Sequence, residues 1–190
     1  MCELCNHSQE PRLSRRAAML GMGAAITLSA LHRAHADQAI SLTPPPNAIH
    51  PDEALKRLMD GNARYAANAP NERDFSHGRA ERVAVQYPIA AVLSCSDSRV
   101  SPELAFDQGP GDVFVVRIAG NFVDDDGLAS LEYAVKILGV PLLMVLGHTN
   151  CGAVGAAVKV VTERAELPGH LPVLVEAIKP AVIAAHGRHP

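Results

Sequence analysis

Two short segments of the chain carry side chains that could together bind one metal ion. The first offers Cys95 and Asp97, and the second offers His148 and Cys151. Two thiolates and an imidazole favour zinc over magnesium or calcium, and a carboxylate can complete a tetrahedral ligand set. With Asp97 on the metal the site would be structural, whereas with water in that position it would be catalytic. The residue types alone leave this choice open.

The spacing within each segment favours convergence of these side chains. Cys95 and Asp97 are two residues apart, so in an extended segment both project to the same side. His148 and Cys151 are three residues apart, which places them on one face of a first helical turn. The simpler alternative is a disulfide between Cys95 and Cys151 beside unrelated polar residues, as an oxidising compartment would permit.

The elements that would position these segments follow from the apolar pattern. Three apolar runs are typical of buried strands: 89–93, 113–118 and 142–146. Four segments have the spacing or start signals of helices: 51–65, 128–138, 151–161 and 173–185. The alternation predicts an α/β fold, with a parallel-core β-sheet flanked by α-helices. Both polar segments then follow the carboxyl ends of strands, where open α/β sheets build their sites.

Two of the expected helices carry specific local predictions. The helix over 128–138 has N-cap candidates at 124–126, a stop at Gly139, and one apolar face, which we expect to be buried. That face comprises Leu128, Leu131, Val135 and Leu138. In the last helix, Pro180 predicts an interruption or a kink, because proline lacks the amide donor that an inner turn requires.

Composition limits the classes of protein. The 190 residues, 48% of them hydrophobic, suffice for one domain with an aliphatic core, since aromatic residues are only 4% and Trp is absent. A net charge of −3, with Lys and Arg scattered along the chain, argues against a nucleic-acid partner.

The first 36 residues have the pattern of a twin-arginine export signal. Arg15 and Arg16 precede an uncharged stretch, 17–31, and a small-residue cleavage site ends at Ala36. The stretch is too short to span a bilayer comfortably, so we expect a periplasmic protein without stable membrane insertion. The remaining chain would comprise a Pro-rich linker, 37–51, and one domain, 52–190. The alternative is an ordinary amphipathic terminus. Cys2 and Cys5 fall in the segment predicted to be removed.

Two motifs carry a family resemblance. CSDSRV at 95–100 and GHTNCGAV at 147–154 closely resemble the signature motifs of the β-class carbonic anhydrases. The resemblance extends over about 52–166 and includes three more stretches: PDEALKRLMDGNARYAAN, FVVRIAGN and SLEYAVKILGV. It implies the family's fold, although we find no counterpart of its C-terminal edge strand, and the sequence reads as a short form or a fragment. It also implies reversible hydration of carbon dioxide to bicarbonate and a proton by zinc-bound hydroxide.

The resemblance implies a role for each motif residue. Cys95, His148 and Cys151 match the permanent ligands of one Zn²⁺ per subunit. Asp97 and Arg99 match a catalytic pair in which the arginine holds the carboxylate off the metal, so that water takes the fourth position. A bidentate guanidinium suits this task because its planar fork fixes the orientation of the carboxylate.

The resemblance also implies a substrate pocket. Gln86 matches a glutamine that donates a hydrogen bond to substrate in the plant-like branch, and Phe114, Tyr133 and Gly152 match that branch's pocket positions. The aromatic wall would come partly from a neighbouring subunit, which implies a homodimer or higher homo-oligomer. Val92, expected to line the pocket, replaces the Trp of the bicarbonate-regulated bacterial branch, so we expect no bicarbonate-locked state. Alternatively, Gln86 is an exposed strand-edge residue and Tyr133 a core residue.

Two other functions fit the same residues. The same zinc site could hydrolyse carbonyl sulfide or carbon disulfide, which resemble carbon dioxide in shape. Truncation could instead leave a non-catalytic zinc-binding module. The presence of Asp97, Arg99 and Gln86 argues against such a module, because a structural site requires neither a latch nor a substrate amide.

Overall fold

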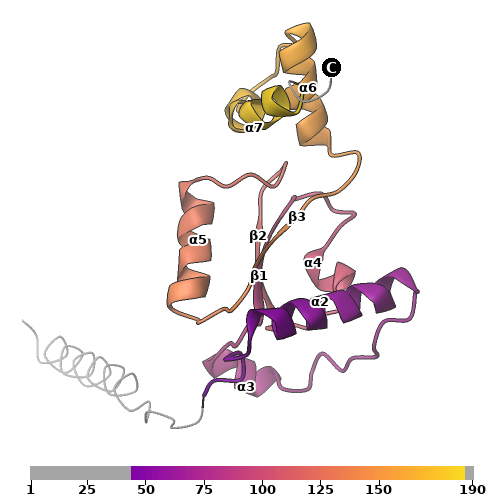
Figure 1. The fold of residues 1–190 in the computed structure, drawn as a ribbon, viewed down its shortest axis with the longest axis vertical. Coiled ribbons are helices and arrows are strands. Elements are labelled where there is room, and N and C mark those ends of the chain that lie inside the picture. The colour runs from indigo at the N-terminus through magenta and orange to yellow at the C-terminus, as the bar shows by residue number, and fades with distance from the viewer. Residues whose placement is uncertain (1–43, 187–190) are drawn as a thin grey trace, which may run out of the picture. The chain divides into compact units, whose positions relative to one another are not determined.

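A computed structural model describes residues 44–186 of the chain (Figure 1). The predicted export signal, with Cys2 and Cys5, lies outside the described residues. Among the residues that are described, no helix has the length and apolar character needed to cross a membrane.

The sheet has three parallel strands in the order β2-β1-β3 within residues 44–186. They are β1 (Ala90–Ser94), β2 (Val113–Arg117) and β3 (Leu143–Leu146). In the register, Ser94 at the end of β1 pairs with Arg117 of β2 and with Leu146 of β3. All five residues of β1 are buried, as expected for a central strand covered on both faces. The three predicted strands and the predicted α/β class are therefore confirmed.

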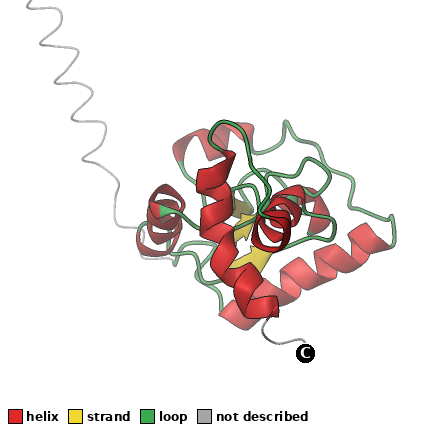
Figure 2. Cartoon of the chain, turned by 90° about the horizontal axis from the view of Figure 1, so that it is seen from above, coloured by secondary structure: helices red, strands yellow, loops and turns green. Residues whose placement is uncertain are grey.

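Helices cover both faces of this sheet. The described helices are α2 (Pro51–Ala66), α3 (Arg79–Ala84), α4 (Pro102–Ala105), α5 (Asp125–Lys136), α6 (Gly152–Glu163) and α7 (Leu171–His186). Leu58 of α2 packs on Val92 in one core cluster, whereas Leu131 of α5 packs on Ala91 in another. The alternation of side chains along β1 directs neighbouring residues to opposite faces and so separates the two clusters. Figure 2 shows the strands between these helices.

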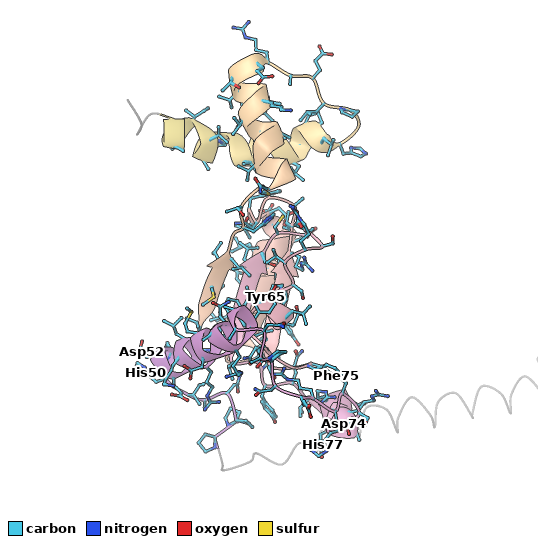
Figure 3. All side chains as sticks on the ribbon, turned by 90° about the vertical axis from the view of Figure 1, so that its right-hand side faces the viewer. His50, Asp52, Tyr65, Asp74, Phe75 and His77 are labelled. Atoms are coloured by element: carbon cyan, nitrogen blue, oxygen red, sulfur yellow. The ribbon has the colours of Figure 1, made fainter. Side chains whose placement is uncertain are left out.

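The start of α2 anchors the preceding segment to the domain. His50 caps the helix, because its ring Nδ1 accepts the amide N–H of Asp52 at 3.3 Å (Figure 3). Asn47, within the predicted linker, is fully buried, and its Nδ2 donates to the carbonyls of Pro88 at 3.2 Å and Leu138 at 2.8 Å. A buried amide with two carbonyl partners fixes the chain at this point.

The buried face of α5 differs from the prediction. Leu128 and Val135 are 47% and 39% exposed, and the buried residues are Gly127, Leu131 and Ala134. Two of these buried residues, Gly127 and Ala134, are small and let α5 pack closely on its neighbours. A Cβ on Gly127 would lie only 3.2 Å from Ile118 Cδ1. The predicted cap is confirmed at Asp124, whose Oδ1 accepts the Gly127 amide at 2.8 Å. The helix ends at Lys136, three residues before the predicted stop.

Helix α7 packs against α6 and runs through Pro180. The predicted interruption is therefore absent at this proline, and the alternative, a kink, stays a prediction. Val175, Ile178 and Val182 lie on both sides of Pro180 in the sequence and are all buried in the cluster shared with α6. This packing stabilises the helix across the missing amide donor, because tertiary burial contributes more to helix stability than local propensity.

Candidate metal centre

The chain topology brings the three metal-ligand candidates to one edge of the sheet. Cys95 directly follows β1, His148 lies two residues after β3, and Cys151 is the N-cap of α6. Because β1 and β3 are adjacent parallel strands, their carboxyl ends lie side by side. The ligand atoms of Cys95, His148 and Cys151 all lie within 4.8 Å of one another. The predicted convergence of these three residues is therefore present in the structure.

The separation of the two sulfur atoms suits a shared zinc ion. Cys95 Sγ and Cys151 Sγ are 3.8 Å apart. Two thiolates about 2.3 Å from one tetrahedral zinc would lie about 3.8 Å apart. A disulfide requires a separation of about 2.05 Å, so the two thiols are free in this structure.

The third candidate, His148, presents an unpartnered nitrogen to the same point. Its Nδ1 lies 2.9 Å from the carbonyl oxygen of Thr149, which can only accept, so Nδ1 carries the proton. Its Nε2 is buried and has no hydrogen-bond partner among the described residues. A carbonyl that fixes the tautomer of a ligand histidine is the usual arrangement around metals. The donor set therefore fits zinc.

The Cys95 sulfur lies in surroundings that favour the thiolate. Burial alone would raise its pKa, but the Gly120 amide, 3.2 Å from Sγ, and the His148 ring lower the pKa to about 7. The Cys95 sulfur in turn raises the pKa of His148. Gly120 has φ +87°, and a Cβ there would lie 2.4 Å from Ile178 Cδ1, so the close approach of this amide requires glycine.

Asp97 is held beside the three ligands by Arg99. The Arg99 guanidinium donates from Nε to Oδ1 at 2.9 Å and from Nη2 to Oδ2 at 2.8 Å, and the Arg99 amide donates to Oδ1 at 3.0 Å. These bonds hold the pKa of Asp97 well below its usual range. Oδ2 is 3.9 Å from His148 Nε2. Arg99 Nη2 also donates to the Asn150 carbonyl at 3.2 Å, so this arginine links the two motifs.

The predicted pocket residues are divided between two places. Gly152 adjoins Cys151, and Phe114 lies near Tyr133, with ring centroids 6.4 Å apart. Phe114 pairs with Ala91, four residues before Cys95 in β1, and Tyr133 is 48% exposed on α5. The aromatic pair is therefore set back along the strands from the metal ligands.

Gln86 lies at the opposite end of β1 from the metal ligands of the same chain. It is exposed and lines a groove of about 320 Å³ with neighbours such as Arg82 and Asp112. The five residues of β1 separate it from Cys95, at about 3.3 Å per residue. Val92, expected to line the pocket, is fully buried under α2, because strand alternation directs it into the core. That prediction is wrong.

Sequence reasoning missed three residues that shape this region or its surroundings. The residue types of Gly120 and Arg117 do not indicate a role in the site. Both residues nevertheless lie where β2 ends, at the same edge of the sheet as the ligands. Asp107 forms a second aspartate–arginine cluster, in which Arg64 Nε donates to Oδ2 at 2.5 Å and Arg73 contacts both Oδ1 and the backbone carbonyl. In the sequence, the only indication of a role for Asp107 was its position as an acidic residue just after the apolar end of a short helix.

Comparison with known proteins identifies a family. The family model described as carbonic anhydrase matches residues 90–189. The chain is 45% identical over 135 residues to carbonic anhydrase 2 of Mycobacterium tuberculosis, covering 70% of this chain and 65% of that protein. The chain thus spans a little less than two thirds of the length of this relative.

Solved structures show the same fold. The β-carbonic anhydrase of Coccomyxa, in complex with acetazolamide, is 29% identical with a TM-score of 0.52, covering 71% of this chain and 60% of that chain. A structure among two tetrameric β-carbonic anhydrases from Sordaria macrospora is 26% identical with a TM-score of 0.52, covering 72% and 67%. Because the family model matches more than half of the residues of this chain, the chain belongs to the β-class carbonic anhydrases.

Proposed function

We propose that this chain catalyses the reversible hydration of carbon dioxide to bicarbonate and a proton. One observation carries the proposal: three ligand atoms converge within 4.8 Å, while the nearest carboxylate, Asp97, is bonded to Arg99. Three protein ligands with one open position are typical of catalytic zinc, whereas four protein ligands are typical of structural zinc. Family membership supports the same reaction.

Cys95, His148 and Cys151 would hold the zinc ion. When bound, zinc lowers the pKa of water at its open position and so supplies a nucleophile near neutral pH. The His148 ring is fixed for this task by its Nδ1–H bond to Thr149, which directs the lone pair of Nε2 into the site. The Gly120 amide stabilises the negative charge on the Cys95 sulfur.

Asp97 would orient the nucleophile and accept its hydrogen bond at Oδ2, the oxygen nearer to His148. Its lowered pKa makes it a weak base, so the released proton passes to buffer or to another group. Release of Asp97 from Arg99 would let the carboxylate occupy the open position and exclude water. The Asp97 and Arg99 pair would thus act as a latch.

The substrate pocket would be completed by a second copy of the chain. Gln86 lies at the far end of β1 from its own metal ligands, and both Gln86 and Tyr133 are exposed. A homodimer, or a larger homo-oligomer, could present them to the ligands of a neighbouring subunit. This arrangement would correspond to the plant-like branch, and Val92, in place of Trp, supports the absence of a bicarbonate-locked state.

The protein would act after export to the periplasm. The support is the sequence pattern of paired arginines, an uncharged stretch and a small-residue site before Asp37. Mass spectrometry of a periplasmic fraction should find a mature N-terminus at Asp37. An N-terminus at Met1 or Cys2 in the exported protein would contradict this.

The activity is tested by measuring zinc per chain and stopped-flow carbon dioxide hydration on the purified protein. Cys151→Ser should lose zinc and hydration together, whereas Ser96→Ala, an exposed neighbour of Cys95, should retain both. One zinc per chain with hydration no faster than buffer would overturn the proposal. Turnover of carbon disulfide or carbonyl sulfide without carbon dioxide hydration would favour the alternative reaction.

A further inference from the structure

Arg117 lies where the first motif leaves the sheet. It is the last residue of β2 and pairs with Ser94, the residue before Cys95. The ladder continues for one more bond, from the Ile118 amide to the Ser94 carbonyl at 3.0 Å. No further backbone–backbone hydrogen bond joins the two described segments beyond this one, and the contact is continued by the Gly120 amide, which donates to Cys95 Sγ, and by the Arg117 side chain.

The Arg117 guanidinium binds three carbonyl oxygens of the segment 95–100. Nε donates to the Cys95 carbonyl at 2.9 Å, and Nη2 donates to the carbonyls of Asp97 at 2.6 Å and Val100 at 3.1 Å. Within residues 44–186, Arg117 forms no ion pair with a carboxylate. The hydrogen bonds of its side chain all go to the segment that contains Cys95, Asp97 and Arg99.

This segment has few hydrogen bonds of its own. A single turn bond runs from the Val100 amide to the Asp97 carbonyl at 3.3 Å. Arg99 holds the Asp97 carboxylate, but these two residues are only two apart, so their bond does not fix them relative to Cys95. Arg99 reaches outside the segment only at the Asn150 carbonyl, at 3.2 Å. Arg117 is anchored in the sheet and so fixes the turn against the strands.

We infer that Arg117 is a positioning residue that keeps Asp97 on Arg99 and away from the metal position. The inference rests on the proposed function of the site. Asp97 Oδ2 is already 3.9 Å from His148 Nε2, so a small shift of the turn would bring the carboxylate among the ligands. Two arginines thus hold one aspartate, Arg99 by its carboxylate and Arg117 by its backbone carbonyl.

The test uses cobalt(II) in place of zinc in the purified full chain, because the visible absorption of cobalt responds to the identity of its ligands. Arg117→Gln should shift the cobalt spectrum at a fixed neutral pH and lower kcat by about tenfold or more. In an Asp97→Asn background, Arg117→Gln should cause no further shift, because the carboxylate is absent. Arg117→Lys should also shift the spectrum, since one ammonium cannot reproduce the three-carbonyl contact of a planar fork.

Arg82 provides the matched control. It donates to the carbonyls of His77 at 2.9 Å and Phe75 at 3.2 Å, in a segment that contains no metal ligand. Arg82→Gln should therefore leave the cobalt spectrum unchanged. A wild-type spectrum in Arg117→Gln at full metal loading, or in Arg117→Lys if the glutamine variant does not fold, would overturn the inference. Failure of the proposed function would be seen separately, as absent hydration by the unmodified zinc protein.

Discussion

Within residues 44–186, the structure holds two aspartate–arginine clusters of the same chemistry in different surroundings. The Asp107 side chain is 1% exposed, and its partners Arg64 and Arg73 are 34% and 26% exposed. The Asp97 side chain is 18% exposed, and its partner Arg99 is 62% exposed. Both carboxyl groups have a lowered pKa, yet only Asp97 adjoins the metal ligands.

The two clusters also differ in the distance along the chain that they connect. Asp97 and Arg99 are two residues apart, whereas Asp107 binds Arg64 and Arg73 from positions 43 and 34 residues away. Asp107 also accepts the Asn71 amide at 3.2 Å. A local pair can open without disturbing the fold, but opening the Asp107 cluster removes bonds that tie α2 and the following loop to the end of α4. The first cluster is suited to a latch and the second to a structural tie.

Arg99→Ala should lose most of the hydration activity if the Asp97 cluster is a latch. We expect hydration at neutral pH to fall by about tenfold to a hundredfold, because Asp97 loses the partner that keeps it from the metal. The midpoint of thermal unfolding of the zinc protein should change little, since an exposed pair contributes little to stability. Stopped-flow hydration and thermal unfolding measure the two quantities.

Arg57→Ala is a suitable control for Arg99→Ala. Arg57 forms an exposed pair with Glu53 on α2, with Nε to Oε1 at 2.9 Å, and should affect neither quantity. Full activity in Arg99→Ala would show that Asp97 needs no latch, and the two clusters would then not differ in function.

Asp107→Asn should have the opposite profile. We expect the free energy of unfolding to fall by about 3 kcal/mol, because two arginines lose their buried counter-ion. The figure is at the lower end of the usual range for buried pairs, since both arginines can turn toward water. Hydration per bound zinc should remain within about twofold of the unmodified protein, given that Asp107 contacts no metal ligand. Chemical denaturation and zinc-normalised kinetics provide the measurements.

The matched control for Asp107→Asn is Asp60→Asn. Asp60 accepts from Lys56 Nζ at 2.6 Å on the exposed face of α2, and its loss should leave stability unchanged within the error of denaturation. A large loss of hydration per zinc in Asp107→Asn, beyond about twofold, would contradict the assignment of a purely structural role to the Asp107 cluster.

The sequence was sufficient to predict the sheet and the convergence of the ligands. The apolar runs lead directly into polar motifs, and parallel strands carry those motifs to one edge, so Cys95, His148 and Cys151 could be expected to meet. The buried face of α5 was displaced by one residue because contact there is decided by Gly127 and Ala134. Small residues that allow close packing contribute little to an apolar stripe.

The hydrogen-bond partners of Asp107 and Arg117 could not be predicted, because they lie far apart in the sequence and no local pattern connects them. Nothing in the sequence around Asp107 points to Arg73, 34 residues earlier, or to its burial. The sequence showed Arg117 only as a member of the FVVRIAGN motif, because its role depends on strand register and on backbone carbonyls. Carbonyl acceptors are present at every residue, so a sequence cannot show which of them an arginine binds.

The stability of the protein in acid should report on the Asp107 cluster. Burial alone would raise the pKa of Asp107, but Arg64, Arg73 and the Asn71 amide lower it from 3.8 to about 2. The folded state therefore favours the ionised carboxylate, and its contribution to stability is complete above about pH 5. The contribution declines as the pH falls below the unfolded value and is lost near pH 2, an effect of about 2 kcal/mol.

This titration appears as the difference in unfolding free energy between the unmodified protein and Asp107→Asn, measured from pH 6 to pH 2. Zinc loss in acid affects both proteins alike and so cancels in the difference. We expect the difference to remain constant down to about pH 5 and then to decrease by about 2 kcal/mol. A difference that stayed constant to pH 2 would mean that the pKa of Asp107 is the same in the folded and unfolded states. The arginines would then not lower the pKa of Asp107, and the buried cluster would be held together by hydrogen bonds that do not depend on its charge.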